Sequence, residues 1–97
     1  MEQDNTYNGW ANYATWNVSL HLNNEYEWYK GLQGLVRNCC INETKLDAIE
    51  EMTSALPKYV AMLSNDDGSF GDLAADELKE VYWEEIAEGE IDAEWTD

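Results

Sequence analysis

The clearest helical pattern of the chain lies in residues 72–89, which read DLAADELKEVYWEEIAEG. At 100° per residue, one face of a helix with this sequence collects the apolar side chains Ala74, Ala75, Leu78, Val81, Tyr82 and Ile86. Asp72 is a residue type favoured at a helix N-cap, and Gly89 is the type that follows a helix C-terminus. We therefore expect one amphipathic helix whose body runs from Leu73 to Glu88.

Upstream, residues 16–23 fit two kinds of secondary structure. Every second residue from Trp16 to Leu22 is apolar and the residues between them are polar, which is the period of a half-buried strand. A lone strand leaves its backbone hydrogen-bonding groups unsatisfied, and the sequence offers no second strand to pair with it. We therefore expect a short helix over residues 16–23 and keep a strand there, within an α+β fold, as the alternative.

Two further helices are expected between these segments. Apolar side chains recur at helical spacing over residues 26–39, and again after a start near Asn42 or Thr44. Pro57 is expected to end or kink the second of these helices, because proline lacks the N–H that a helix interior needs. The polar run of residues 64–69 is typical of a loop.

Together these segments predict an all-α fold, a small single domain of three to four helices over residues 1–97. A chain of 97 residues suffices for one domain, and 44% of them are hydrophobic, so a core can form. Residues 1–14 are polar and aromatic, and they predict an irregular arm packed across the helices. Residues 90–97 are expected to follow the last helix as an acidic tail.

The charge of the chain is strongly one-sided. Asp and Glu number 21 against five Lys and Arg, which gives a net charge of -16 at pH 7. Thirteen of these acids, with one base, fall in residues 66–97. The chain would be repelled by nucleic acid and by an anionic membrane, so we expect it to bind neither directly.

The acids of residues 76–94 predict a partner-binding surface. On the expected helix, every fourth residue from Asp76 to Glu88 is acidic, which forms a like-charge row with a step of about 6 Å. Such a row slightly destabilises its own helix, so helix stability does not explain it. The candidate partner-binding residues are Asp76, Glu77, Glu80, Glu84, Glu88, Glu90, Asp92 and Glu94.

Two interpretations of these acids stay open. In the first, they form a solvated face that keeps a small protein in solution. In the second, the carboxylates imitate the phosphates of a nucleic acid, of which duplex DNA carries one charge per ~1.7 Å of its axis. A surface of the second kind competes for the Lys- and Arg-lined channels that hold DNA or RNA, and its binding depends strongly on salt.

A second candidate surface is aromatic. The chain holds five Trp and six Tyr, and most of them are expected in the core. Trp28 and Trp83 lie off the apolar stripes of their helices, and exposed Trp and Tyr often carry binding energy. Trp28, Tyr29 and Trp83 are therefore a candidate interface for a host protein, and a homodimer is a further alternative.

No constellation of residues points to catalysis, a metal or a cofactor. The adjacent Cys39 and Cys40, with the single histidine of the chain, cannot complete a four-ligand zinc site without carboxylates. Residues 66–77 match an EF-hand loop at its first, sixth and twelfth positions, but Gly68 and Phe70 offer no side-chain oxygen at its third and fifth. We expect no enzyme, no catalytic residue, no metal site and no cofactor.

Two segments resemble a group of small phage and plasmid proteins. Residues 12–18, NYATWNV, followed by LHLNNE at 20–25, resemble a motif near the start of these proteins, in which an Asn, two variable residues and Thr-Trp open a short apolar segment. Residues 81–88, VYWEEIAE, are similar to the carboxyl-terminal helix of the same group, whose pattern includes Trp, Glu two residues later and Ile-Ala-Glu. The resemblance implies a mobile genetic element, a setting in which small acidic proteins frequently block restriction or CRISPR machinery. It transfers no catalytic or binding residue.

These observations predict a phage- or plasmid-encoded inhibitor of a host nucleic-acid-handling defence system, of the anti-CRISPR or antirestriction kind. Its acidic surface is expected to mimic DNA and to occupy the basic channel of a host nucleic-acid-binding protein or complex. The alternatives are an accessory protein that binds a host protein through the aromatic patch, and a structural or self-assembling phage protein. The polar, acidic first residues lack the features of a signal peptide, so we expect the host bacterial cytoplasm as the location.

Overall fold

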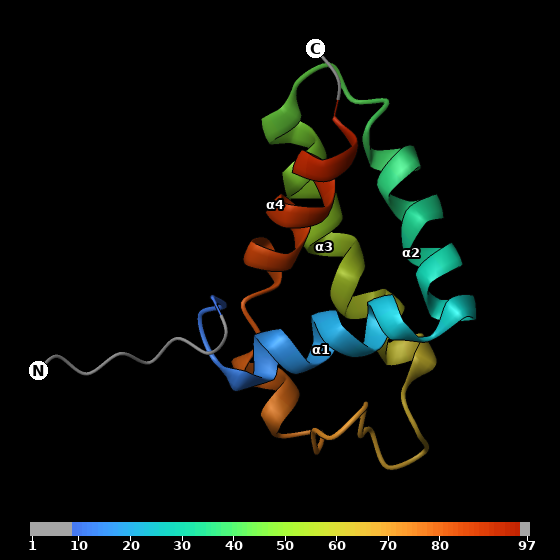
Figure 1. The fold of residues 1–97 in the computed structure, drawn as a ribbon, viewed down its shortest axis with the longest axis vertical. Coiled ribbons are helices and arrows are strands. Elements are labelled where there is room, and N and C mark those ends of the chain that lie inside the picture. The colour runs from blue at the N-terminus through green and yellow to red at the C-terminus, as the bar shows by residue number, and fades with distance from the viewer. Residues whose placement is uncertain (1–8, 96–97) are drawn as a thin grey trace, which may run out of the picture.

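The computed structural model describes residues 9–95, which form four α-helices and one short 3₁₀-helix (Figure 1). In chain order they are α1 (Tyr13–Asn24), α2 (Tyr26–Cys39), α3 (Lys45–Leu63), η1 (Glu77–Glu80) and α4 (Trp83–Glu94). No β-strand is present within residues 9–95, where Phe70 and Leu73 pair in an isolated bridge. The predicted all-α fold is confirmed, and α1 excludes the alternative in which residues 16–23 form a strand.

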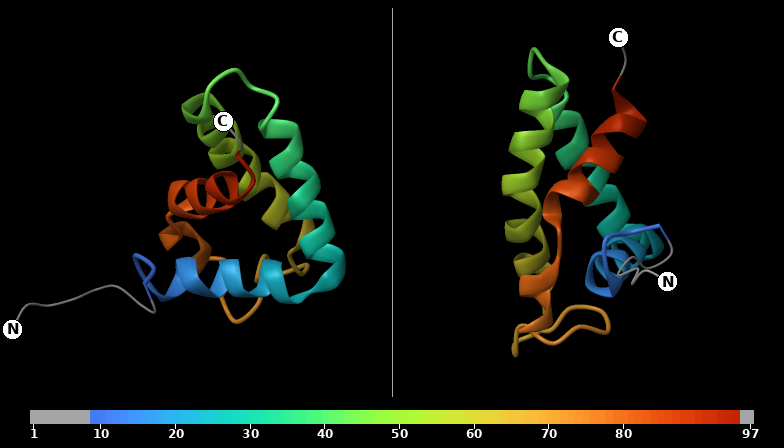
Figure 2. Two further views of the ribbon diagram at one scale, coloured as in Figure 1. Left: turned by 45° about the horizontal axis from the view of Figure 1, so that its top comes forward. Right: turned by 90° about the vertical axis from the view of Figure 1, so that its left-hand side faces the viewer.

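Three helices pack side by side, and α1 lies crosswise at one end of them (Figures 1 and 2). α3 and α4 make the most extensive contact of any two elements, and α2 packs against both. The core between the helices takes buried side chains from all four, among them Leu22, Leu32, Met52 and Ile86. The chain after α3 passes close to α1 before it enters η1 and α4 (Figure 1).

α1 begins at Tyr13, three residues earlier than expected, because Asn12 caps it. The Oδ1 atom of Asn12 accepts a hydrogen bond from the backbone N–H of Thr15 at 2.9 Å. The arm expected over residues 1–14 therefore ends at Asn12, and Ala14 is a buried residue of the helix. Residues 1–8 of that arm lie outside the described residues.

Pro57 does not end α3, which continues beyond it. The missing N–H of proline costs the helix one hydrogen bond. Leu56 and Val60, on either side of Pro57, are fully buried in the core, and each such side chain contributes roughly 1.5–3 kcal/mol. This burial offsets the lost bond. Thr44, one of the two predicted starts, caps the helix through its side chain.

The helix expected over residues 73–88 is wrong at both of its ends. The chain turns tightly at Phe70 and Leu73, which exchange two backbone hydrogen bonds of 2.9 Å and are both buried. Asp72 lies in this turn and caps no helix. After η1, two residues without regular structure precede the true start of α4 at Trp83.

Contacts with α1 explain why this segment is not one helix. The buried side chain of Asn17 donates from Nδ2 to Oδ2 of Asp72 and accepts from the backbone N–H of Asp72, both at 3.2 Å. The Oγ1 atom of Thr15 accepts a hydrogen bond from the backbone N–H of Tyr82 at 3.0 Å. Because these partners lie 55 and 67 positions apart in the sequence, helical periodicity does not reveal them.

α4 passes through Gly89, so this glycine does not end a helix, and residues 90–94 of the expected tail are helical. Residues 96–97 of that tail lie outside the described residues. The side chains of Ile86, Ala87 and Ile91 are buried on one face of α4. The burial of Ile91 carries the apolar face of the helix beyond the end that Gly89 suggests. The helix therefore continues past Gly89 because Ile91 packs into the core.

α2 and α3 approach closely at Gly31. A Cβ atom at this position would lie 2.1 Å from the hydroxyl oxygen of Tyr59. That hydroxyl donates a 2.7 Å hydrogen bond to the backbone carbonyl of Trp28, and burial raises the pKa of Tyr59. The ring of Trp28 stacks on Phe70 with centroids 5.0 Å apart. This aromatic group fixes the loop that follows α3 against α2.

Candidate functional site

The structure places three of the eight predicted binding acids at η1 and five on α4. Asp76 directly precedes η1, which contains Glu77 and Glu80. The other five lie on α4 and are Glu84, Glu88, Glu90, Asp92 and Glu94. The expected row of every fourth residue from Asp76 to Glu88 on one helix is therefore wrong, because η1 and α4 are separate elements. A shorter row does form on α4, where Glu84, Glu88 and Asp92 share one face at a step of about 6 Å.

Two of the predicted acids are engaged by the protein itself. The Oε1 atom of Glu77 accepts a hydrogen bond from the backbone N–H of Ala74 at 2.9 Å, which closes the turn before η1. The carboxylate of Asp92 forms an ion pair with Lys45 at the start of α3. Lys45 therefore neutralises one end of the row on α4.

Glu90 is half-buried on α4. Its Oε2 atom accepts a hydrogen bond of 3.4 Å from Nδ2 of Asn23 in α1. Burial raises the pKa of the Glu90 carboxyl, the hydrogen bond from Asn23 lowers it by less, and repulsion from Glu94 raises it further. Glu90 thus belongs to the contact between α4 and α1 more than to the exposed surface.

The remaining predicted acids are exposed. Their carboxylates make no hydrogen bond and no ion pair with any other of the residues 9–95, and the five are Asp76, Glu80, Glu84, Glu88 and Glu94. α4 alone carries six carboxylates on twelve residues, a length of about 18 Å. This is about one charge per 3 Å, close to the one charge per ~3.4 Å of a single DNA strand.

The helix dipole acts on these acids in opposite directions. Glu84 and Glu85 lie in the first turn of α4, where the partial positive charge of the helix terminus favours carboxylates. Asp92 and Glu94 lie near its end, where no basic side chain occupies the last turn and the dipole disfavours them. The acids at the end of α4 therefore cost stability.

A hollow of about 380 Å³ lies on the outer side of α4 next to the arm. It is lined by Gly9, Trp10, Lys45, Glu85, Glu88, Gly89 and Asp92. The Oε1 atom of Glu85 accepts a 2.9 Å hydrogen bond from the backbone N–H of Ala11, which holds the arm against α4. Sequence reasoning missed Trp10 and Lys45 as site residues, because the course of the arm over α4 leaves no local pattern. An indole ring beside carboxylates favours an ammonium or guanidinium group.

The structure does not bring Trp28, Tyr29 and Trp83 together as one aromatic patch. Trp28 lies on the side of α3 that carries Tyr59, to which it is hydrogen-bonded. Trp83 lines a hollow with Ala61 of α3. Ala61 lies two positions after Tyr59, a rotation of about 200° around the helix, so Trp83 and Trp28 contact opposite sides of α3. Tyr29 is 39% exposed and faces solvent on α2.

Cys39 and Cys40, at the end of α2, are both free thiols. No three His, Cys, Asp or Glu side chains within residues 9–95 are grouped so that they could hold a metal ion. Burial, followed by repulsion from Glu51 and Cys40, raises the pKa of the Cys39 thiol to about 11. Burial and then Glu94 raise the pKa of Cys40 as well. Both thiols are therefore weak nucleophiles at neutral pH.

None of the helices in the described part of the chain combines the length and the apolar character needed to cross a lipid bilayer.

Comparison with known proteins gives one match. The model of a family of unknown function, DUF7249, matches residues 3–95. No curated protein and no solved structure matches the chain.

Proposed function

We propose that this chain, which belongs to the family of unknown function DUF7249, is a phage- or plasmid-encoded inhibitor of a host nucleic-acid-handling defence system, of the anti-CRISPR or antirestriction kind. The carboxylates of η1 and α4 occupy the cationic groove in which the target protein holds DNA or RNA. The target is a protein, and the inhibitor acts in the cytoplasm of the host cell without binding nucleic acid itself.

The observation that carries this proposal is the set of exposed acids without a partner in the described part of the chain. Asp76 and Glu80 at η1, with Glu84 and Glu88 on α4, are available to cations from outside. Counted together with the other carboxylates of the helix, they give α4 about one carboxylate per 3 Å, close to the charge spacing of one DNA strand. A groove that binds phosphates through Lys and Arg side chains can pair with carboxylates at this spacing.

These acids do not stabilise the fold through ion pairs within the described part of the chain. Lys45 is the only cation that forms an ion pair with an acid of α4 among residues 9–95. The net charge of -16 opposes folding through self-repulsion. A cationic partner would relieve this repulsion, which gives the charge a role in binding.

The hollow around Trp10 supports the same class of partner. Trp10, Glu85 and Glu88 line this hollow, where Lys45 already pairs with Asp92, and a further cation placed over an aromatic ring beside carboxylates is attracted by both. An Arg or Lys side chain of the target fits this chemistry. The hollow therefore supplies one defined contact within the broader acidic surface.

The proposal is tested by capturing proteins from a nuclease-treated bacterial lysate on the immobilised full chain, at about 50 mM and about 200 mM salt. We expect the retained proteins to be nucleic-acid-binding, to be lost at the higher salt, and to be displaced by an excess of duplex DNA. Retention that is insensitive to salt and to DNA would contradict the proposal and favour an aromatic interface instead.

A further inference from the structure

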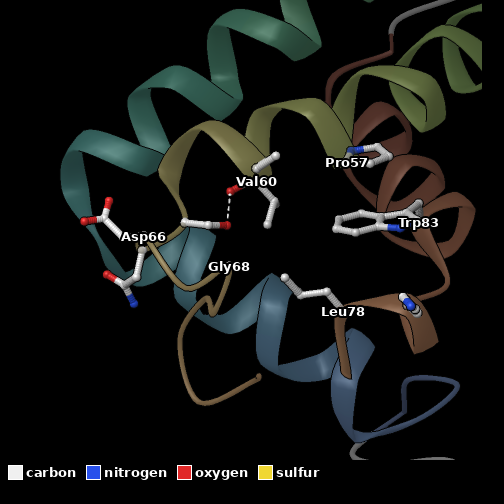
Figure 3. Close-up of a pocket in the computed structure, with 10 residues that line it drawn as sticks. Pro57, Val60, Asp66, Gly68, Leu78 and Trp83 are labelled. Carbon is white, nitrogen blue, oxygen red and sulfur yellow. Dashed lines mark hydrogen bonds between the residues drawn. The ribbon is translucent and has the colours of Figure 1, made fainter. Parts of the chain in front are cut away.

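A second hollow, of about 430 Å³, lies between α3, η1 and the start of α4 (Figure 3). Val60 of α3, Leu78 of η1 and Trp83 of α4 point into the same space from three sides (Figure 3). Pro57 and Ala61 complete its wall on α3. We refer to this hollow as the Trp83 pocket.

The floor of the Trp83 pocket is apolar and open to a ligand. Trp83 and Leu78 are half-buried, and they pack against the core without being covered by another part of residues 9–95. The indole N–H of Trp83 has no acceptor among the described residues. A volume of this size lies within the range of ~300–1,000 Å³ in which ligand sites are found.

The chain around the pocket is strongly acidic. Asp66 and Lys79 line its rim, and the exposed acids Glu80 and Glu84 directly follow the lining residues Lys79 and Trp83. Residues 64–84, which form two of its three walls, contain seven acids and one base. Lys58, exposed on α3 next to Pro57, is the other cation close to the pocket in sequence. The segment that forms two walls of the pocket therefore carries a net negative charge, while the lining itself holds one acid and one base around an apolar floor.

We propose that the Trp83 pocket receives one large apolar side chain from a cationic segment of a partner protein. This inference rests on the proposed function and adds an anchor to it. The acids of η1 and α4 attract the cationic segment, and the pocket then takes the apolar side chain out of water. The combination selects partner segments in which Lys or Arg flank an aromatic or branched aliphatic residue.

Two synthetic peptides probe the pocket on the full chain. The first is lysine-rich with one central phenylalanine, and the second has alanine in place of that phenylalanine. Binding of each is measured by isothermal titration calorimetry. We expect the phenylalanine peptide to bind about tenfold or more tightly than the alanine peptide, because the pocket buries its ring.

Two variants of the protein test whether the preference for the phenylalanine peptide arises from the Trp83 pocket. Ala61→Trp fills the pocket from an exposed position of α3 and should remove the preference for phenylalanine without weakening the alanine peptide. Ala93→Trp places the same side chain at an exposed position of α4 that lines neither the Trp83 pocket nor the hollow at Trp10, and it should retain the preference.

The outcomes separate this inference from the proposed function. If both peptides bind equally and lose affinity with salt, the pocket has no role and the inference is overturned, while the acidic surface keeps its proposed function. If the preference survives in Ala61→Trp, the apolar contact lies elsewhere and the inference is again overturned. If neither peptide binds, both proposals fail. Sedimentation equilibrium of the chain alone measures its oligomeric state. A dimer that Ala61→Trp dissociates would show that a second copy of the chain fills the pocket, and this would overturn the inference of a cationic partner segment.

Discussion

Thr15 and Asn17 position the last third of the chain from α1. The Oγ1 atom of Thr15 donates to Oδ1 of Asn12 at 2.6 Å and accepts from the backbone N–H of Tyr82. Asn17 binds both the backbone and the carboxylate of Asp72. Both side chains are fully buried, and buried polar groups that lose a partner cost free energy. These two residues therefore decide where the chain turns before α4.

Thr15→Val tests this role, because valine keeps the shape of threonine without its hydroxyl. We expect the free energy of unfolding to fall by about 1–2 kcal/mol, since the N–H of Tyr82 loses its acceptor. The control is Thr53→Val, which removes only a local hydrogen bond to Ile49 within α3 and should cost about 0.5 kcal/mol or less. Urea unfolding measures both variants, and equal losses would contradict the role of Thr15.

Glu90 gives a pH-dependent prediction. Burial raises the pKa of its carboxyl, so the folded state holds the proton more tightly than the unfolded state. The ionised carboxylate therefore lowers the free energy of unfolding at pH values above its raised pKa. This cost disappears as the pH falls below the ordinary value of 4.5.

Glu90→Gln should accordingly raise the melting temperature at pH 7 and leave it unchanged at a pH below 4.5. The amide oxygen can still accept the hydrogen bond from Asn23. Glu88→Gln removes the same charge from an exposed position and corrects for general repulsion. A Glu90→Gln variant no more stable than Glu88→Gln at pH 7 would show that burial of this carboxyl carries no cost.

At the scale of elements, α4 is the helix whose limits the sequence pattern misplaces. Its apolar face runs from Trp83 through Ile86 to Ile91, whereas the pattern of residues 73–88 joins two separate elements. Gly89 lies inside α4, and a Cβ atom there would meet nothing within 4 Å. A glycine in such a position weakens the helix because of the freedom it has in the unfolded chain.

Gly89→Ala tests whether the helix continues through residue 89, as observed, or ends there, as the sequence pattern predicts. Within α4 the substitution should raise the free energy of unfolding by about 0.5–1 kcal/mol. If a helix ended at Gly89 in a left-handed conformation, alanine would instead destabilise the protein. Gly68→Ala is the contrast, because Gly68 has a φ of +86° and alanine is strained there. Urea unfolding should therefore shift in opposite directions for the two variants.

At the scale of the whole molecule, the sequence predicts what local patterns determine. The all-α class and the start of α3 after Thr44 follow from periodicity and capping residues. The helical state of residues 16–23 follows from the absence of a second strand in the sequence that could pair with them. The start of α4 does not, because it depends on Thr15 and Asn17 in a helix at the other end of the chain. Tertiary contacts here override local helix propensity.

The number of acids in the last third of the chain was predictable from the sequence, and their arrangement on the surface was not. The excess of acids over residues 66–97 is visible in the sequence. Their distribution depends on the fold, which places Asp92 against Lys45, buries part of Glu90 and leaves Glu84 and Glu88 free on α4. The hollow at Trp10 could not be foreseen either, since it arises where the arm crosses α4.

The most direct test of the central claim is the salt dependence of affinity for a captured target, measured for two charge-reversed variants. Glu84→Lys with Glu88→Lys changes two free acids of α4, and Glu27→Lys with Glu50→Lys changes two exposed acids of α2 and α3 by the same total charge. Glu27 and Glu84 each lie in the first turn of their helix, so the helical cost is matched.

We predict that the α4 pair abolishes binding at low salt. The matched pair should still bind the target and still lose affinity as the salt concentration rises. Circular dichroism should show equal helix content for the two variants. Equal affinities for the two pairs would contradict the claim that the carboxylates of α4 take the place of nucleic-acid phosphates.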